Sequence, residues 1–260
     1  MGAPRKAVDL FLSLGMGASL ACSSVGPMPT ALAQHQHHPA ALAEGGEGGE
    51  GGEGGEGQPQ VVSSDIDLLV VLAQMQGHLR IAKELLSQGK AQAAEPHLGH
   101  PADELYGAVA PALQQRGVNG LGASLTALRD QARLKPGAAV LIASLTKAQQ
   151  AISAASQSIP AAVRNDPQTS LAMVRQLAAA AASEYDGAVA DGRIVEVIEY
   201  QDARGFLLEA AALLESSPAQ PRLASATTIV KSMLKAFPTA TAPRAALINP
   251  QQLQVLQAKL

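Results

Sequence analysis

Residues 61–260 show no sustained alternation of apolar and polar positions, the pattern that a half-buried strand would give. Alanine is frequent along this stretch, and aromatic residues make up only 2% of the chain. Both features favour helix over strand, so the pattern predicts an all-α fold, an antiparallel helical bundle with short connections. The expected helices cover residues 64–89, 101–116, 124–133, 136–158, 167–191, 193–216 and 224–236, with a short helix near the end.

Capping residues and prolines mark where several of these helices begin. Ser64 can cap the first helix, and Asp166 followed by Pro167 is typical of a helix start. The segment 95–101 contains two prolines and two histidines and predicts a turn between the first two helices. No flexible linker divides the helical stretch, so we expect a single bundle domain, long enough to bury a sizeable core.

The first 33 residues predict a cleaved signal peptide. Arg5 and Lys6 supply its positive start, an apolar run follows over 10–21, and residues 31–33 form a small-residue cleavage site. A lipid anchor on Cys22 is the alternative. For a Gram-negative source the destination is the periplasm. The mature chain contains no later segment that is long and apolar enough to span a membrane.

Residues 34–60 predict a disordered tail rich in Gly and Glu, because nothing in them can bury apolar surface. Three imidazoles lie close together in this tail, on His35, His37 and His38, and could hold a divalent cation such as Cu(II), Ni(II) or Zn(II). A solubilising tether is the alternative explanation of the same composition. The glutamates of the tail account for the net charge of −3, which leaves the helical part nearly neutral.

Charge and motifs exclude several classes of protein. A nearly neutral folded part offers no basic surface to nucleic acid, and one Cys cannot form an intrachain disulfide. The chain lacks the Glu-x-x-His pairs of ferritin-like di-iron bundles, the Cys-x-x-Cys-His of covalent haem and the His-Glu-x-x-His of common metalloproteases. Glycine loops of the phosphate-binding kind are also missing, so the sequence names no reaction.

Candidate metal ligands lie on apolar helix faces and in the turn, where a polar side chain must find a partner. His78 falls in the apolar arc of the first helix, with Gln74 about one turn before it. His100 and Glu104 are four residues apart and can share a helix face, and His97 in the turn can fold back toward them. Mixed imidazole and carboxylate ligands suit Zn(II), iron or Cu(II). The alternatives are an ordinary hydrogen-bonded core histidine and a polar turn that caps a helix.

The helix expected over 193–216 carries acidic side chains although it is apolar on every side, which is typical of a central, buried helix. Glu196 and Glu199 share one arc, where they must be paired, protonated or bound to metal. Tyr200 and Asp202 could complete a polar pocket beside them. The alternatives are ion pairs with neighbouring arginines and an enzyme that uses a glutamate as general base, for which no motif is present.

Five short motifs punctuate residues 64–116: Gln76-Gly77-His78, Glu95-Pro96-His97, Gly99-His100-Pro101, Glu104-Leu105-Tyr106 and Pro111-Ala112-Leu113. With them, this stretch resembles bacterial periplasmic helical domains associated with iron uptake, both imelysin-like proteins and the helices associated with iron permeases. The layout is similar: a long helix, a short glycine-containing turn, and a helix with Glu and Tyr. The resemblance implies an all-α extracytoplasmic domain with a role in iron handling.

Together these features predict a periplasmic metal-binding or metal-delivery protein that holds one ion, iron or copper first. The ion would lie between the helix of His78, the turn over 97–104 and the helix segment 196–202. The tail histidines could capture metal and pass it inward, and a membrane transport or redox complex is the expected partner. The alternative is a non-catalytic structural or interaction module, accessory to a membrane complex. The distances among the candidate side chains discriminate between the two.

Overall fold

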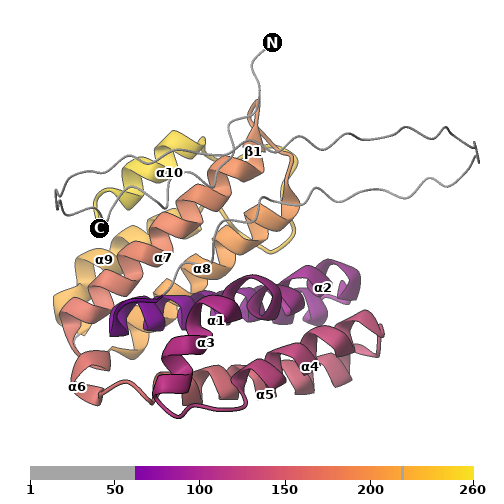
Figure 1. The fold of residues 1–260 in the computed structure, drawn as a ribbon. Helices are drawn as coiled ribbons and strands as arrows, with labels where there is room; N and C mark the ends of the chain where they lie inside the picture. The colour runs from indigo at the N-terminus through magenta and orange to yellow at the C-terminus, as the bar shows by residue number, and fades with distance from the viewer. Residues whose placement is uncertain (1–61, 218–219) are drawn as a thin grey trace, which may run out of the picture. The chain divides into compact units, whose positions relative to one another are not determined.

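The computed structural model describes residues 62–217 and 220–260, and one short hairpin is the sole β-ladder among the elements of these residues (Figure 1). The predicted all-α fold is confirmed. The expectations for the signal peptide, Cys22 and the histidine-bearing tail lie outside the described residues. The elements are α1 Asp65–Ser87, α2 Ala91–His100, the π-helical turn η2 Pro101–Leu105, α3 Tyr106–Gln115, α4 Leu121–Arg133, α5 Ala138–Ser156, α6 Ala161–Arg164, α7 Pro167–Ala188, β1 Val189–Ala190, β2 Arg193–Ile194, α8 Val197–Ser216, the 3-10 turn η3 Gln220–Leu223, α9 Ala224–Leu234 and α10 Pro250–Gln257.

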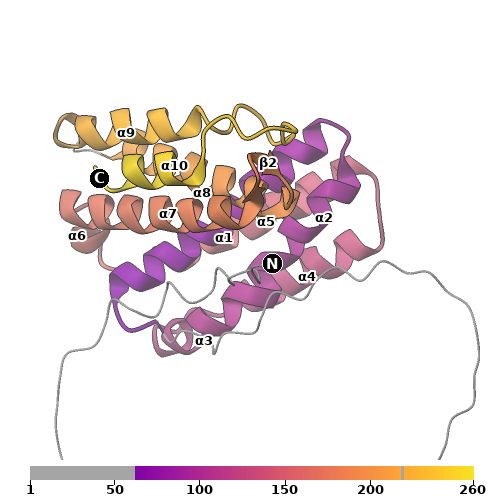
Figure 2. The ribbon, with the colours of Figure 1, turned by 90° about the horizontal axis from the view of Figure 1, so that it is seen from above.

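Helix α1 is the central element, because it packs on both sides (Figures 1 and 2). One side contacts α7 and α8, and the other contacts α2 and α5. This explains why the apolar residues of α1 are spread over much of its circumference. Helices α7 and α8 pack most extensively against each other, and α9 and α10 cover them. Among the described helices, none combines the length and apolarity needed to cross a bilayer.

The turn expected over residues 95–101 is wrong, because the chain is helical there. Helix α2 runs through Pro96 to His100 and continues into η2. The proline removes one backbone donor, but burial of Ala94, His97 and Leu98 against the neighbouring helices outweighs that loss. Pro101 then widens the backbone into a π-turn, in which the N–H of Tyr106 donates to the carbonyl of Pro101. The result places His97 and His100 on one rigid segment.

The helix expected from residue 193 begins at Val197 instead. Asp191 and Gly192 both have positive φ, 50° and 71°, which is the geometry of a tight two-residue hairpin turn. This turn pairs Val189 with Ile194 and uses residues 193–194 as a strand. The difference of four residues changes which side chains of this segment belong to the helix.

Helices α1 and α8 approach each other closely at two glycines. A Cβ added to Gly205 would lie 2.6 Å from the carbonyl oxygen of Gly77, and a Cβ added to Gly77 would lie 3.1 Å from the carbonyl of Gly205. No side chain fits between the two backbones here. His78 follows Gly77 directly, and Asp202 lies one turn before Gly205, so this crossing brings both side chains within reach of each other.

Candidate metal centre

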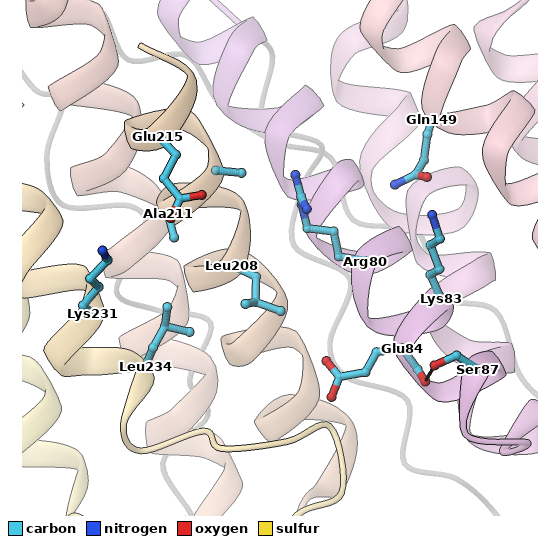
Figure 3. Close-up of a pocket in the computed structure, with 11 residues that line it drawn as sticks. Arg80, Lys83, Glu84, Ser87, Gln149, Leu208, Ala211, Glu215, Lys231 and Leu234 are labelled. Atoms are coloured by element: carbon cyan, nitrogen blue, oxygen red, sulfur yellow. Dashed lines mark hydrogen bonds between the residues drawn. The ribbon is translucent and has the colours of Figure 1, made fainter. Parts of the chain in front are cut away.

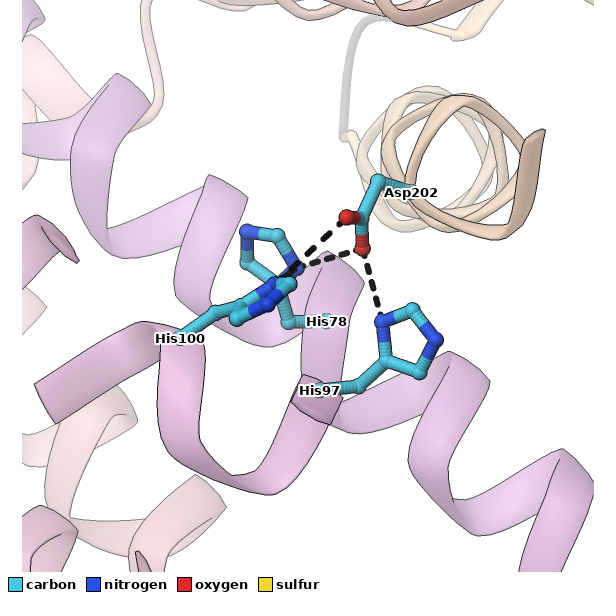
Figure 4. A group of neighbouring side chains, drawn as sticks. All are labelled: His78, His97, His100 and Asp202. Atoms are coloured by element: carbon cyan, nitrogen blue, oxygen red, sulfur yellow. Dashed lines mark hydrogen bonds and ion pairs between the residues drawn. The ribbon is translucent and has the colours of Figure 1, made fainter. Parts of the chain in front are cut away.

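Three imidazoles and one carboxylate converge where α1, α2 and α8 meet (Figure 4). His78 Nδ1 lies 2.7 Å and His97 Nδ1 2.8 Å from the same oxygen, Asp202 Oδ1. His100 Nδ1 lies 3.4 Å from His78 Nδ1 and 3.5 Å from Asp202 Oδ2. One ligand atom from each of the four residues falls within 4.8 Å of all the others. These are the distances of a site that a single metal ion can fill.

The hydrogen bonds of His97 fix its tautomer. Gln201 donates its amide N–H to the carbonyl of Ala240 at 2.9 Å, so its oxygen faces His97 and accepts from His97 Nε2–H at 2.8 Å. A neutral imidazole carries one hydrogen, which Nε2 already holds. Its bare Nδ1 would then face a carboxylate oxygen that has no hydrogen of its own. A cation, either a proton or a metal ion, must therefore sit among these atoms.

Charge and burial perturb the pKa values at the centre in opposite directions. Burial alone would raise the pKa of Asp202, but the charge of His78 and the hydrogen bonds of the three histidines lower it well below its ordinary value. Burial alone would lower the pKa of His100, but its hydrogen bond to Asp202 and the nearby carboxylates raise it. The Asp202 carboxylate thus stays ionised, which a metal ligand requires.

Three further carboxylates, on Glu104, Glu184 and Glu199, lie near the centre: the charges of Glu104 and Glu199 act on His100, and Glu184 interacts with Glu199 and Asp202. Glu104 Oε1 lies 3.6 Å from His100 Nε2. Glu184 and Glu199 are hydrogen-bonded to each other, and burial together with that bond raises the pKa of Glu184 well above its ordinary value. The negative charges of Asp202 and Glu104 add to this rise. We call these three residues the carboxylate rim.

The structure distributes the other predicted residues as follows. The expectation of a buried Glu196 is wrong, because it is an exposed N-cap residue that precedes α8. Tyr200 is buried, donates to the carbonyl of Thr239 at 3.1 Å and does not belong to the four converging residues; burial raises its pKa to about 12. Gln74 is half-buried on α1 and is not one of the four converging residues.

Helix α8 also holds the surroundings of the centre in place. Glu84 of α1 accepts from Arg204 at 2.9 Å and from the backbone N–H of Ala240 at 2.8 Å. Arg204 in turn donates to the carbonyl of Phe237. Because Gln201 bonds to the same loop, this ion pair fixes the support behind His97. On the other side, the ring of Phe206 meets the ring of His78 edge-on at 5.0 Å.

A pocket of about 740 Å³ opens elsewhere, between α1, α8 and α9 (Figure 3). It is lined by charges of both signs, among them Arg80, Lys83, Glu84 and Lys231. Arg80 pairs with Glu209, and Glu84 is engaged as described above. The pocket contains none of the four converging residues, so its size does not mark the metal centre.

Two residues of the centre's surroundings have no counterpart among the sequence-based candidates. Gln201 fixes the tautomer of His97, and Glu184 belongs to the carboxylate rim. Asp202, expected only to support the site, is its central carboxylate. The signals available in the sequence were weak: an acid and an amide side by side in an apolar helix, and a lone Glu after a run of alanines.

Residues 160–260 match the family model of the iron permease-associated 4-helix bundle domain. The resemblance to iron-permease-associated helical domains is thereby confirmed, although the match covers α6 to α10 rather than the stretch 64–116 on which the resemblance was based. No curated protein and no solved structure matches the chain significantly.

Proposed function

We propose that this protein is an extracytoplasmic accessory of iron uptake that binds a metal ion, iron or copper first, through His78, His97, His100 and Asp202. The observation that carries the proposal is the pair of contacts at Asp202 Oδ1, where two imidazole Nδ1 atoms lie within 2.8 Å of one carboxylate oxygen. The hydrogen bond from His97 Nε2 to Gln201 makes a cation necessary there. The iron permease-associated bundle over 160–260 supports a membrane transport partner.

The donor set suits borderline divalent ions such as Fe(II), Cu(II) and Zn(II), because it combines imidazole nitrogens with one carboxylate oxygen. Metal–ligand bonds of about 2.0–2.2 Å in a tetrahedral site separate the ligand atoms by about 3.3–3.6 Å. Four contacts among these residues measure 2.7–3.5 Å, and all four ligand atoms lie within 4.8 Å of one another, so most of the distances are near that spacing. Loading an ion thus needs shifts of up to about 1.5 Å in the distances between ligand atoms. The expected periplasmic location and the metal capture by the tail histidines belong to the same proposal.

Calorimetric titration tests the proposal. The protein is the full chain with His35→Ala, His37→Ala and His38→Ala, so that the tail cannot bind metal. We expect one saturable site for Cu(II), for Zn(II) and, without oxygen, for Fe(II). Asp202→Asn keeps the shape of the side chain but removes its charge and should weaken binding at least about tenfold. Asp186→Asn, an exposed change of the same kind on α7, should leave binding unchanged.

The alternative is a structural or interaction module, and one observation favours it. Among the described residues, no buried side-chain nitrogen or oxygen lacks a hydrogen-bond partner. The histidine cluster around Asp202 would then be a hydrogen-bonded polar network in the core that orders the helices. Absence of saturable binding with each of the three ions would leave this alternative and end the metal proposal.

A further inference from the structure

We propose that His100 is the exchangeable ligand of the centre, and that the metal ion is loaded and released past it, over the carboxylates of Glu104 and Glu199. This inference rests on the proposed function and describes how the same site exchanges its ion with solvent.

Exposure of the side chains falls in steps from Glu104 through His100 into the centre. The side chain of Glu104 is 58% exposed and that of His100 is 18% exposed. Those of His78, Asp202 and His97 are 4%, 6% and 0% exposed. Among the four converging residues, His100 is therefore the one with substantial access to solvent. An ion that reaches the other three ligands must displace or follow its imidazole.

The contacts of the three histidines also differ in strength. His97 is held from both sides, by Asp202 and by Gln201, each at 2.8 Å. His78 is held by Asp202 at 2.7 Å and by the ring of Phe206. His100 has contacts of 3.4–3.6 Å, which are too long for strong hydrogen bonds. Its ring is the least restrained of the three, and a π-turn, a frequent feature of functional sites, follows directly.

The two nitrogens of His100 face two different environments. Nδ1 faces His78 and Asp202 in the centre, whereas Nε2 faces Glu104 at the surface. The charges of Glu104 and Glu199 both act on this imidazole. A cation arriving from solvent meets the negative potential of Glu104 and Glu199 first, and a short rotation of His100 then transfers it between outer and inner positions.

Rates of metal exchange test this inference. The probe is Co(II), whose visible absorption reports tetrahedral coordination, mixed in stopped flow with the full chain in which the three tail histidines are alanine. Release is measured by adding excess EDTA. Glu104→Gln and Glu199→Gln should each slow association about three- to fivefold at low salt, and less at high salt. Glu196→Gln is the matched control, because Glu196 is exposed and outside the carboxylate rim; its rate should equal that of the parent.

Substitution of the histidines separates a mobile ligand from a fixed one. His100→Ala should still bind Co(II) and release it at least about tenfold faster, whereas His97→Ala should lose binding. Equal association rates in Glu104→Gln, Glu199→Gln and Glu196→Gln would overturn the inference and leave the proposed function standing. If His97→Ala does not fold, the association rates of Glu104→Gln and Glu199→Gln test the inference without it. Failure of the parent protein to bind Co(II), Cu(II) or Zn(II) would overturn both.

Discussion

Replacement of Gly205 by alanine tests whether the α1–α8 crossing sets the geometry of the centre. The added Cβ would lie 2.6 Å from the carbonyl oxygen of Gly77 and 2.9 Å from Ile81 Cγ1. Ordinary contact begins near 3.4 Å, so the helices must separate by about 0.8 Å at this point. The same shift would lengthen the His78–Asp202 contact from 2.7 Å to about 3.5 Å, beyond a good hydrogen bond.

Overpacking of this kind destabilises by about 1–3 kcal/mol, and the better helix propensity of alanine returns up to about 1 kcal/mol. We therefore expect Gly205→Ala to lose about 1–2 kcal/mol of unfolding free energy in urea and to bind Zn(II) at least about tenfold more weakly. Gly107→Ala in α3 is the control, because its Cβ would meet nothing within 4 Å; it should be as stable as the parent or slightly more stable. Parent-like stability and metal affinity in Gly205→Ala would refute the reasoning.

Two more predictions concern the hydrogen bonds and charges of the centre. Gln201→Met removes the acceptor of His97 Nε2–H. It should lower the free energy of unfolding in urea by about 1–3 kcal/mol and weaken Zn(II) binding about 10–100-fold. Unchanged Zn(II) affinity would show that the hydrogen bond behind His97 is not needed. In metal-free protein the pKa of His100 is raised above 6.5, so its stabilising contribution is complete below pH 6.5 and is lost as the pH rises through the folded-state value. The pKa of Asp202 is lowered below 3.8, so its contribution is present above pH 3.8 and is lost only on further acidification. The urea concentration at the unfolding midpoint, measured with EDTA present, should decrease as the pH rises above 6.5. His100→Gln should show a smaller decrease. An identical pH profile in the two proteins would contradict the stabilising role of His100.

The fold class follows from the sequence because it depends on composition summed over many residues. Alanine-rich segments without alternation gave helices, and Asp166 with Pro167 marked the start of α7 correctly. The prediction of a turn at 95–101 was wrong because the rule that proline ends a helix considers only the local sequence, whereas α2 is stabilised by packing of its buried face. The start of α8 was placed too early because the Asp191-Gly192 hairpin turn carries only a short signal.

The candidate site could be predicted in part, as far as single residues and their helix faces indicate it. The rule that a polar residue on an apolar face needs a partner identified His78, and the three histidines do lie together. The segment 196–202 was expected near His78, but Asp202 could not be identified as the central carboxylate, because it lies 124 residues further along the chain and only the packing of α8 on α1 sets which side chain reaches His78. The error at Glu196 follows from the misplaced helix start, since a helical wheel is meaningful only inside the helix.

The centre is divided between two parts of the chain, and this limits what the family match implies. The matched range contributes Asp202 together with Gln201, Glu184 and Glu199, whereas all three imidazoles come from α1 and α2, outside it. The bundle alone therefore offers a carboxylate but not the nitrogen ligands that would select a borderline metal. Because the ligands come together only when α1 packs on α8, any ion held there must stabilise that packing, and metal binding is coupled to the arrangement of the helices. The proposed metal binding would thus depend on the contact between the matched bundle and the helices before it.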